Sequence, residues 1–348
     1  MSLGMPPSRS DLVVIETAGL DRVVEYEPAD LTVTVEAGMR FQALQALLGQ
    51  EGQFLALDPP AQDGATIGGL IATNASGPLR FGYGTARDLV IGTRVANPEG
   101  TLTRAGGRVV KNVAGYDLNK LYIGSLGTLA IIVELSFKLA PIPPAFATVA
   151  GTFDSAGAAA AVVGGVVHSS LSPLAIELLG SRQVVFRVGG YPRTVERQVR
   201  ELSGLIARNG GSAADSNWEE LCRQWVAAYQ RQVVVKAAVP ISRSTRLAEI
   251  LEAGLSELAP VVWAHAGSGV AYAACDAPDH AESLIRLREE VRGLGANASL
   301  VIERCPTVLK GEVDVWGDPG PAVELMRTLK AKLDPKTTLN PGRYVGGI

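Results

Sequence analysis

The chain has 348 residues, of which 47% are hydrophobic and 19% are charged, with a formal net charge of −3 and a pI near 5.8. This length and hydrophobic content are sufficient for a large core and for two domains, whereas the charge excludes the basic field that binds nucleic acid. The first twenty residues lack a signal-peptide pattern, and the apolar run 155–167 is too short to span a bilayer. We therefore expect a soluble, cytoplasmic protein with no nucleic-acid partner and no transmembrane segment.

The first part of the chain predicts short strands separated by turns. The strand-like runs are DLVVIET (11–17), LTVTVEAG (31–38), LVIGTRVANPEGT (89–101) and LAIIVELSFKL (129–139). Helical patterns occur only at 41–49 and 115–121. This part is therefore predicted to be rich in β-structure.

A domain boundary is predicted at APIPP, residues 140–144, because three prolines there interrupt any helix or central strand. Beyond it, helical patterns at 156–168, 194–208, 242–258 and 277–294 alternate with the strand-like runs AIELLG, QVVFRVG, VVVKAAVP, VVWAHAG and SLVIERC. This alternation favours an α+β domain with an antiparallel sheet covered by helices. A last helix is predicted at 321–333, before the tail DPKTTLNPGRY. The predicted divisions are 1–143, 144–320 and 321–348.

Chemically reactive side chains are scarce. Cys222, Cys275 and Cys305 match no disulfide, zinc or iron–sulfur spacing, so we expect them to be small buried hydrophobes and expect no metal site. The chain has three histidines, His168, His265 and His280. None lies in residues 1–150, which also lack cysteine, so a flavin in this part of the chain would have no usual covalent attachment residue.

Three segments of small residues occur in the first part of the chain: DGATIGGLIATNASG (63–77), FGYGTARD (81–88) and GSLGTLA (124–130). Small residues in a loop let backbone N–H groups approach a ligand, and a diphosphate accepts several such donors at once. Tight turns are the alternative interpretation. No Rossmann or Walker A pattern is present. The segments are predicted to be loops that interrupt strands and carry a long nucleotide-like ligand.

These segments, together with VVKNVAGYDLNKLYIGSLGTLAIIVELSFKL and the distant LDPKTTLNPGRY, resemble the FAD-binding (PCMH-type) domain of the vanillyl-alcohol oxidase and p-cresol methylhydroxylase superfamily. The resemblance covers essentially the whole chain and is strongest to the accessory FAD-binding subunit of the glycolate oxidase branch. It implies a two-domain PCMH-type fold with an antiparallel-sheet cap domain, and a tail that returns from the end of the chain to the FAD-binding domain. It also implies FAD as a non-covalent cofactor.

The resemblance also implies a set of cofactor-binding residues. The flavin and diphosphate would be lined by Pro60, Thr66, Gly68, Gly69, Thr73, Asn74 and Gly77, with the wall continued by Gly84, Thr85 and Asp88. The adenine and ribose side would be held by Gly124, Ser125, Gly127, Thr128 and Ile132. The isoalloxazine would be covered by Asn340 and Arg343, although DP and NP in this tail also act as simple helix stops.

The cap domain departs from the catalytic members of the superfamily. Their metal or base site has the form H-x-G-D-G-N-x-H, whereas this chain reads HAGSGVAY at 265–272, and an E-H-G motif is replaced by ERCPTVLK at 303–310. A lone His265 cannot hold a divalent metal, and its simplest role is a structural hydrogen bond. Catalytic residues therefore remain unassigned at this stage.

The resemblance implies a subunit of a glycolate oxidase complex, with a catalytic FAD subunit and an iron–sulfur subunit as partners. Catalysis by this chain alone is doubtful. A non-catalytic assembly subunit with a lost or weakened flavin site, and an independent dehydrogenase of another 2-hydroxy acid, remain open. So does peripheral attachment, through the complex, at the inner face of the cytoplasmic membrane.

Relatives carry a further diphosphate loop of the form R-G-G-G-T/S before the run that DLVVIET resembles. The segment MSLGMPPSRS offers no comparable loop, so the chain is expected to be shortened at its N-terminus. Hydrogen bonds to charged groups contribute about 1.5–3 kcal/mol each. Without that loop, we expect FAD to be bound weakly or to be lost on purification.

Overall fold

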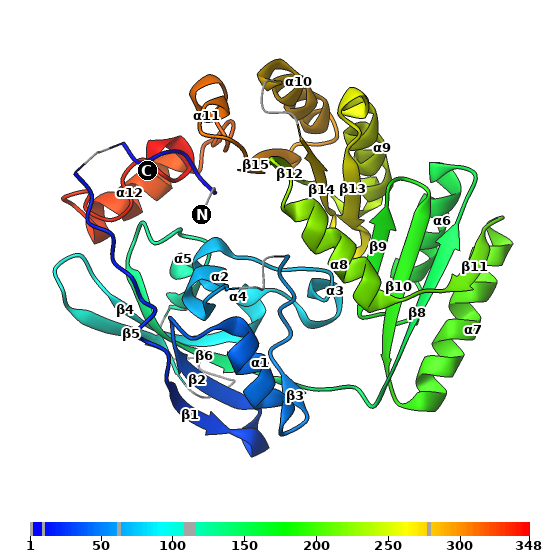
Figure 1. Cartoon of the computed structure of the whole chain (residues 1–348), viewed down its shortest axis with the longest axis horizontal. Helices are drawn as coiled ribbons and strands as arrows, with labels where there is room; N and C mark the ends of the chain where they lie inside the picture. The colour runs from blue at the N-terminus through cyan, green and yellow to red at the C-terminus, as the bar shows by residue number, and fades with distance from the viewer. Residues whose placement is uncertain (1–2, 9–10, 61–63, 108–115, 277–279) are drawn as a thin grey trace. The chain divides into compact units, whose positions relative to one another are not determined.

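The computed structural model describes residues 3–8, 11–60, 64–107, 116–276 and 280–348, which divide into two compact units (Figure 1). The five-stranded unit consists of Gly4–Gly77, Tyr83–Ile142 and Asp318–Ile348. The eight-stranded unit consists of Met1–Leu3, Pro78–Gly82 and Pro143–Gly317. Each unit has a sheet of its own, and each is described separately below.

The five-stranded unit is built on an antiparallel sheet in the order β1-β2-β6-β4-β5. Its strands are β1 Val23–Glu27, β2 Thr32–Glu36, β4 Val90–Ala96, β5 Leu102–Gly106 and β6 Ile131–Lys138, and the short β3 Gln53–Phe54 pairs with β7 Ala140–Pro141. Its helices are α1 Phe41–Gly49, α2 Ile67–Thr73, α4 Ala86–Leu89, α5 Asn119–Tyr122 and α12 Val323–Leu333. The short helix α3 Arg80–Tyr83 begins in the eight-stranded unit and ends here.

Alternation along β2 and β6 gives this sheet one apolar and one polar face. Val35 and Phe137 belong to the buried core, together with Leu44 of α1 and Ile71 of α2. On the polar face, Thr34 Oγ1 and Ser136 Oγ are 2.8 Å apart across the strand pair. The apolar face therefore anchors α1 and α2 on the sheet.

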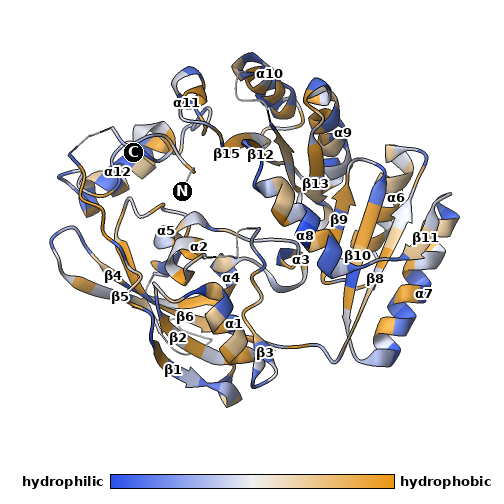
Figure 2. Ribbon diagram, viewed as in Figure 1, coloured by the Kyte–Doolittle hydropathy of each residue, from blue (hydrophilic) through white to orange (hydrophobic). Residues whose placement is uncertain are grey.

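The eight-stranded unit has an antiparallel sheet in the order β11-β8-β10-β9-β13-β14-β12-β15. The strands are β8 Ala145–Thr152, β9 Ala175–Leu179, β10 Gln183–Gly190, β11 Ser212–Asp215, β12 Val233–Ala238, β13 Val261–His265, β14 Val270–Cys275 and β15 Ser299–Arg304. The helices are α6 Ala156–Val167, α7 Pro192–Arg208, α8 Trp218–Tyr229, α9 Ser244–Gly254, α10 Ala281–Arg292 and α11 Leu309–Glu312. Helix α7 buries Val195, Leu202 and Ile206 and is polar on its outer turns (Figure 2).

Helices cover both faces of this sheet. Helix α6 contacts α7 and α9, and α9 contacts α10, so these four helices form one layer. Helix α8 packs on the other face, where Trp225 contacts a cluster that includes Trp263 and Tyr272. Because β13 and β14 place Trp263 opposite Tyr272, and β9 places Glu177 opposite His265, these side chains share the α8 face. This face therefore carries a cluster of buried polar and aromatic side chains.

The predicted fold class, α+β with an antiparallel sheet covered by helices, is confirmed. The helix 41–49 has the predicted bounds, and the other predicted helices differ at their ends by a few residues, whereas the twelve-residue helix α8 was not predicted. The run 11–17 was wrong as a strand, because the structure gives it no strand pairing and leaves Val13 and Val14 more than four-fifths exposed. The first strand instead begins at Val23.

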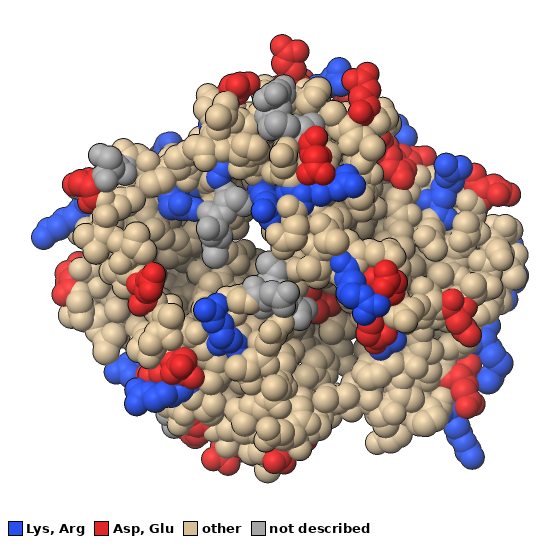
Figure 3. Space-filling view, viewed as in Figure 1, with Lys and Arg blue, Asp and Glu red and all other residues tan. Residues whose placement is uncertain are grey.

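The segment 64–77 is not a loop that interrupts strands, because its centre is helix α2. Likewise, the segment 81–88 contributes to the short helices α3 and α4, and only 124–130 lies outside regular structure. Residues 61–63 and 108–115, which include parts of two predicted motifs, lie outside the described residues. Within the described ranges, no helix has the length and apolarity needed to cross a membrane. Charges of both signs occur over the face in view in Figure 3, with a short run of Lys and Arg above its centre.

Candidate functional site

Helix α2 starts against the sheet of the five-stranded unit. The Thr66 side chain caps it by accepting a hydrogen bond from the Gly69 N–H at 3.2 Å. The N–H groups of Ile67 and Gly68 donate to the carbonyls of Met39 and Ala37 at 2.9 and 2.7 Å. These donors are used inside the unit in this structure, and a contact of Gly68 and Gly69 with FAD stays a prediction.

Gly68 has a packing role. A Cβ at this position would lie 2.8 Å from the Ala37 Cβ and 2.9 Å from the Ala37 carbonyl oxygen. Gly77 is similar, because a Cβ there would lie 1.9 Å from the Asp58 carbonyl oxygen. Both glycines therefore allow close backbone approach within the unit.

The C-terminal end of α2 has features of a ligand site. Asn74 is in the left-handed region, with φ of 51°, and its side-chain Oδ1 is buried without a hydrogen-bond partner among the described residues. Gly124 lies beside it, and a Cβ at Gly124 would come within 3.2 Å of the Asn74 Cβ. A buried acceptor without a donor is costly unless a ligand or water supplies one. This end of α2 therefore fits a ligand that carries a hydroxyl or N–H group.

The segment Gly124–Thr128, here called the glycine loop, packs on the same end of α2. The N–H groups of Gly124 and Leu126 donate to the carbonyls of Ile71 and Ala72 at 2.9 and 2.8 Å. Within the loop, Thr128 Oγ1 donates to the Ser125 carbonyl at 2.7 Å, and Ser125 Oγ donates to the Tyr122 carbonyl at 2.8 Å. The hydroxyls of Ser125 and Thr128 thus stabilise the loop and are buried.

The tail returns from the end of the chain to this loop. Asn340 Nδ2 donates to the Leu126 carbonyl at 2.7 Å. The Lys330 ammonium of α12 donates to the Thr128 carbonyl at 2.7 Å, across 202 positions of sequence. The structure therefore brings Asn74, the glycine loop and Asn340 together. Lys330 was not among the residues predicted from the sequence.

Gly84, Thr85 and Asp88 form a second group at the start of α4. Asp88 accepts hydrogen bonds from the Thr85 N–H and hydroxyl at 2.8 and 3.1 Å, which completes a capping box. The Thr85 N–H lowers the pKa of the Asp88 carboxyl. Gly84 has φ of 87°, which favours glycine. These residues have a helix-capping role in the structure.

Four other predicted site residues of this unit, Pro60, Thr73, Ile132 and Arg343, lie in different environments. Pro60 and Ile132 are buried, and Thr73 donates its hydroxyl to the carbonyls of Gly69 and Leu70. Arg343 is half-buried, and its carbonyl accepts the Met5 N–H at 3.2 Å. A contact of these residues with FAD stays a prediction.

The α8 face of the eight-stranded unit carries a buried carboxylate–imidazole pair. His265 Nδ1 lies 2.7 Å from Glu177 Oε2, and both side chains are over nine-tenths buried. Burial lowers the pKa of His265 well below its ordinary value, and the positive charges of Arg80 and Lys236 lower it further. His265 therefore makes the structural hydrogen bond that the sequence suggested.

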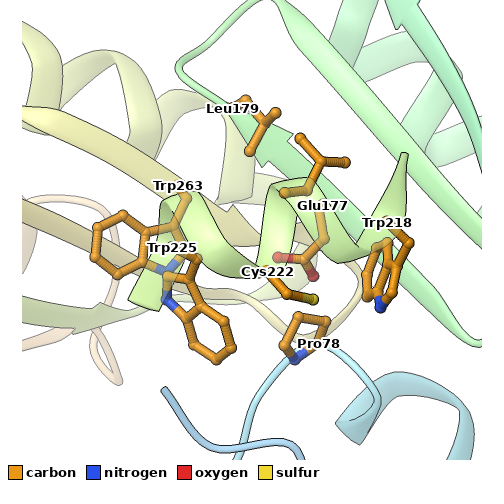
Figure 4. Close-up of a pocket in the computed structure, with 8 residues that line it drawn as sticks. Pro78, Glu177, Leu179, Trp218, Cys222, Trp225 and Trp263 are labelled. Atoms are coloured by element: carbon orange, nitrogen blue, oxygen red, sulfur yellow. The ribbon is translucent and has the colours of Figure 1, made fainter. Parts of the chain in front are cut away.

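Aromatic rings surround this pair. Trp225 meets the His265 ring edge-on at 5.3 Å, and Trp263 stacks on Tyr272 at 5.3 Å. In Figure 4 the indoles of Trp225 and Trp263 lie next to each other on one side of the pocket. Trp218 lies on the other side, and Glu177 and Cys222 lie in the middle. The pocket lined by these side chains has a volume of about 30 Å³, which is room for one or two waters. It is too small for an organic substrate.

A second polar group lies on the same face. Glu303 Oε2 accepts the Tyr229 hydroxyl at 2.7 Å, and Glu303 Oε1 lies 3.0 Å from the Lys236 ammonium. Burial lowers the pKa of Lys236, but Tyr272 and Glu303 outweigh it and the pKa is raised. Both Glu303 oxygens are thus already engaged. Across the described residues, no group of three or more His, Cys, Asp and Glu side chains could hold a metal ion.

The stability of the eight-stranded unit is expected to decrease as the pH drops below about 6.5, which is the ordinary pKa of histidine. Because the folded pKa of His265 is depressed, its stabilising contribution is complete above that pH and is lost as the pH falls. One such group changes the free energy of unfolding by at most about 1.4 kcal/mol per pH unit. The His265→Phe variant should show a shallower dependence between pH 7.5 and 5.

The measurement is urea unfolding followed by tryptophan fluorescence. All four tryptophans, Trp218, Trp225, Trp263 and Trp316, lie in the eight-stranded unit. The charged and titratable groups near the imidazole are Glu177 of β9, Arg80 of α3, Lys236 of β12 and Tyr272 of β14. An identical slope in wild type and variant would contradict the prediction.

Comparisons with known proteins agree with this architecture. Residues 1–106 match the FAD binding domain family, and residues 318–344 match the C-terminal domain of FAD linked oxidases. The crystal structure of p-cresol methylhydroxylase with substrate bound superposes with a TM-score of 0.70 at 14% identity, over 94% of this chain and 78% of that one. These matches and the shared fold support an FAD-binding oxidoreductase of the PCMH type. FAD is its cofactor.

Two curated relatives are glycolate oxidase subunits. GlcD of Bacillus subtilis is 26% identical over 98% of this chain and 80% of its own length. GlcE of Escherichia coli is 42% identical over 124 residues, which is 35% of each chain. The mitochondrial D-lactate dehydrogenase [cytochrome] of Arabidopsis thaliana is 27% identical over 96% of this chain, which spans only 65% of that protein. Some relatives therefore contain a substantial part that this chain does not match.

Proposed function

We propose that this chain is the accessory FAD-binding subunit of a glycolate oxidase complex. In that complex a sister flavin subunit oxidises glycolate to glyoxylate, and an iron–sulfur subunit receives the electrons. The observation that carries the proposal is the 42% identity to GlcE, against 26% to GlcD. The identity to GlcE covers 35% of the chain. A cytoplasmic location, or peripheral membrane attachment through the complex, belongs to the same proposal.

The described residues fit the cofactor at one place in particular. The buried Asn74 Oδ1 lacks a donor, and the N–H of Gly127 in the glycine loop donates to no described residue. FAD carries hydroxyl and amine donors as well as acceptor oxygens, so both unused groups would gain a partner. Bound FAD would supply two-electron redox chemistry. Asn74, Gly124, Gly127 and Asn340 would bind and orient it.

An accessory role is supported by the contacts on the α8 face. A general base for a 2-hydroxy acid has to reach the substrate hydroxyl, and a metal ligand has to offer free lone pairs. Here His265 is 1% exposed and bonded to Glu177, while Glu303 is engaged by Tyr229 and Lys236. Although His265 Nε2 has no hydrogen-bond partner among the described residues, the ring is buried and Glu303 is engaged, so neither group reaches a substrate in this arrangement.

The isolated chain is therefore expected not to oxidise glycolate, even with added FAD and an artificial electron acceptor. Turnover would be measured anaerobically by reduction of the acceptor dye, with D-lactate and D-2-hydroxyglutarate in parallel. The sister flavin subunit serves as the positive control. Glycolate turnover that His265→Ala abolishes would contradict the accessory role, and turnover of another acid alone would favour an independent dehydrogenase.

Co-purification tests the complex itself. A tagged chain expressed in its native host should bring down a second flavoprotein and an iron–sulfur protein, identified by mass spectrometry and by absorbance. Absorbance at the flavin bands, before and after titration of the isolated chain with FAD, distinguishes a flavin-binding subunit from an assembly subunit that has lost the cofactor. A chain that purifies alone from its host would contradict the proposal.

A further inference from the structure

Lys330 is a buried lysine whose donors are all used. Its side chain is 7% exposed, and the ammonium donates to Asp334 Oδ2 at 2.6 Å, to the Thr128 carbonyl at 2.7 Å and to the Leu339 carbonyl at 2.9 Å. An ammonium has three N–H donors, and here each has an acceptor. The three acceptors belong to the end of α12, the glycine loop and the tail, so one side chain joins three segments.

Asp334 completes the junction from the other side. Its side chain is fully buried, and besides Lys330 it accepts the N–H groups of Thr338 and Leu339 at 2.9 and 2.8 Å. The carboxylate therefore turns the chain at the end of α12 and directs residues 338–340 towards the glycine loop. Asn340 then reaches the Leu126 carbonyl.

The loop that is held in this way has an unfavourable backbone conformation. Gly124, Leu126 and Gly127 have φ of 79°, 53° and 68°, and leucine seldom adopts such a value. Such a residue persists only where its surroundings fix it. The carbonyl of Leu126 is bound by Asn340, and that of Thr128 by Lys330. These two contacts lie on either side of Gly127, whose N–H has no partner among the described residues.

We propose that Lys330 and Asp334 are positioning residues for the cofactor: they hold the glycine loop in the conformation that presents the Gly127 N–H to FAD. The inference rests on the proposed function, because it takes the glycine loop as part of the FAD site. It differs from a merely stabilising role. A stabilising pair would change the melting temperature and leave the affinity of the folded protein for FAD unaltered.

The experiment uses the full chain and the Lys330→Met variant, which keeps most of the length of the side chain and removes its three donors. Because a buried, unpaired Asp334 could prevent folding, the second variant is Lys330→Met with Asp334→Asn, in which neither charge remains. The control is Lys332→Met, on an exposed residue of the same helix. Folding of each variant is checked by circular dichroism before use.

Two quantities are measured: the Kd for FAD by calorimetric titration, and hydrogen exchange of the FAD-free protein by mass spectrometry. We expect at least one folded Lys330 variant to bind FAD ten-fold more weakly or worse, and to exchange faster at residues 124–129 and 337–343, with Lys332→Met unchanged. Unaltered loop exchange, or an unaltered Kd, overturns the inference while the proposed function stands. A wild-type chain that binds no FAD overturns both.

Discussion

Replacing Gly77 by alanine is expected to destabilise the five-stranded unit by about 3 kcal/mol or more, since overpacking against an immovable group exceeds the usual cost of an added methyl. The added Cβ would lie 1.9 Å from the Asp58 carbonyl oxygen and 2.7 Å from its Oδ1. The nearest atom is backbone, so no side-chain rotation relieves the clash. The measurement is hydrogen exchange of peptides that contain β2 and β6, the central strands of the unit.

Gly49→Ala is the matched control, because Gly49 is an exposed residue of α1 and a Cβ there would meet nothing within 4 Å. Alanine favours helix over glycine by up to about 1 kcal/mol, so this variant should be unchanged or slightly more stable. If the β2 and β6 peptides of the Gly77→Ala variant exchange hydrogen at the same rate as those of the Gly49→Ala variant, the segments around Gly77 and Asp58 can separate without an energetic cost. The steric argument would then be wrong.

Local sequence patterns predicted many of the strands and most helices, but they missed others, among them helices α2 and α8. The many small residues of the α2 segment predict a ligand-binding loop, and the pair Gly68–Gly69 also lowers helix propensity. Thr66 as a capping residue and the apolar positions Ile67, Leu70 and Ile71, spaced as one helical face, were the signals that favoured a helix. The reason for glycine at position 68 is the nearby Ala37, a contact that no local pattern reveals.

The run 11–17 failed for a related reason. Its β-branched residues fit a strand, but a strand also needs a partner, and the structure pairs β2 with Val23–Glu27 instead. The contacts of Lys330 were missed because acceptors such as the Thr128 carbonyl reach its ammonium only through the tertiary fold. Lys330 and Asp334 are four residues apart, which is also the spacing of an ordinary surface pair. Only the fold brings the Thr128 carbonyl to the ammonium and buries the pair.

The Glu177→Ala variant is expected to lose about 2–4 kcal/mol of the stability of the eight-stranded unit, from a buried donor left unpaired and from lost packing. Glu177 is 6% exposed and His265 is 1% exposed, and the pair joins β9 to β13. Without the carboxylate, His265 Nδ1 faces an apolar surrounding of Trp225 and Tyr272. The midpoint of urea unfolding, followed by tryptophan fluorescence, measures the loss.

Glu201→Ala is the matched control, because Glu201 pairs with Arg197 at 3.3 Å on the exposed side of α7. Such surface pairs contribute about 0.3–0.5 kcal/mol, so its midpoint should barely move. A double variant, Glu177→Leu with His265→Phe, removes both polar groups and fills the space with apolar atoms. It should be more stable than Glu177→Ala, because replacing a buried polar pair costs less than breaking it. A double variant that is less stable than the single variant would show that the pair contributes through contacts beyond its own hydrogen bond.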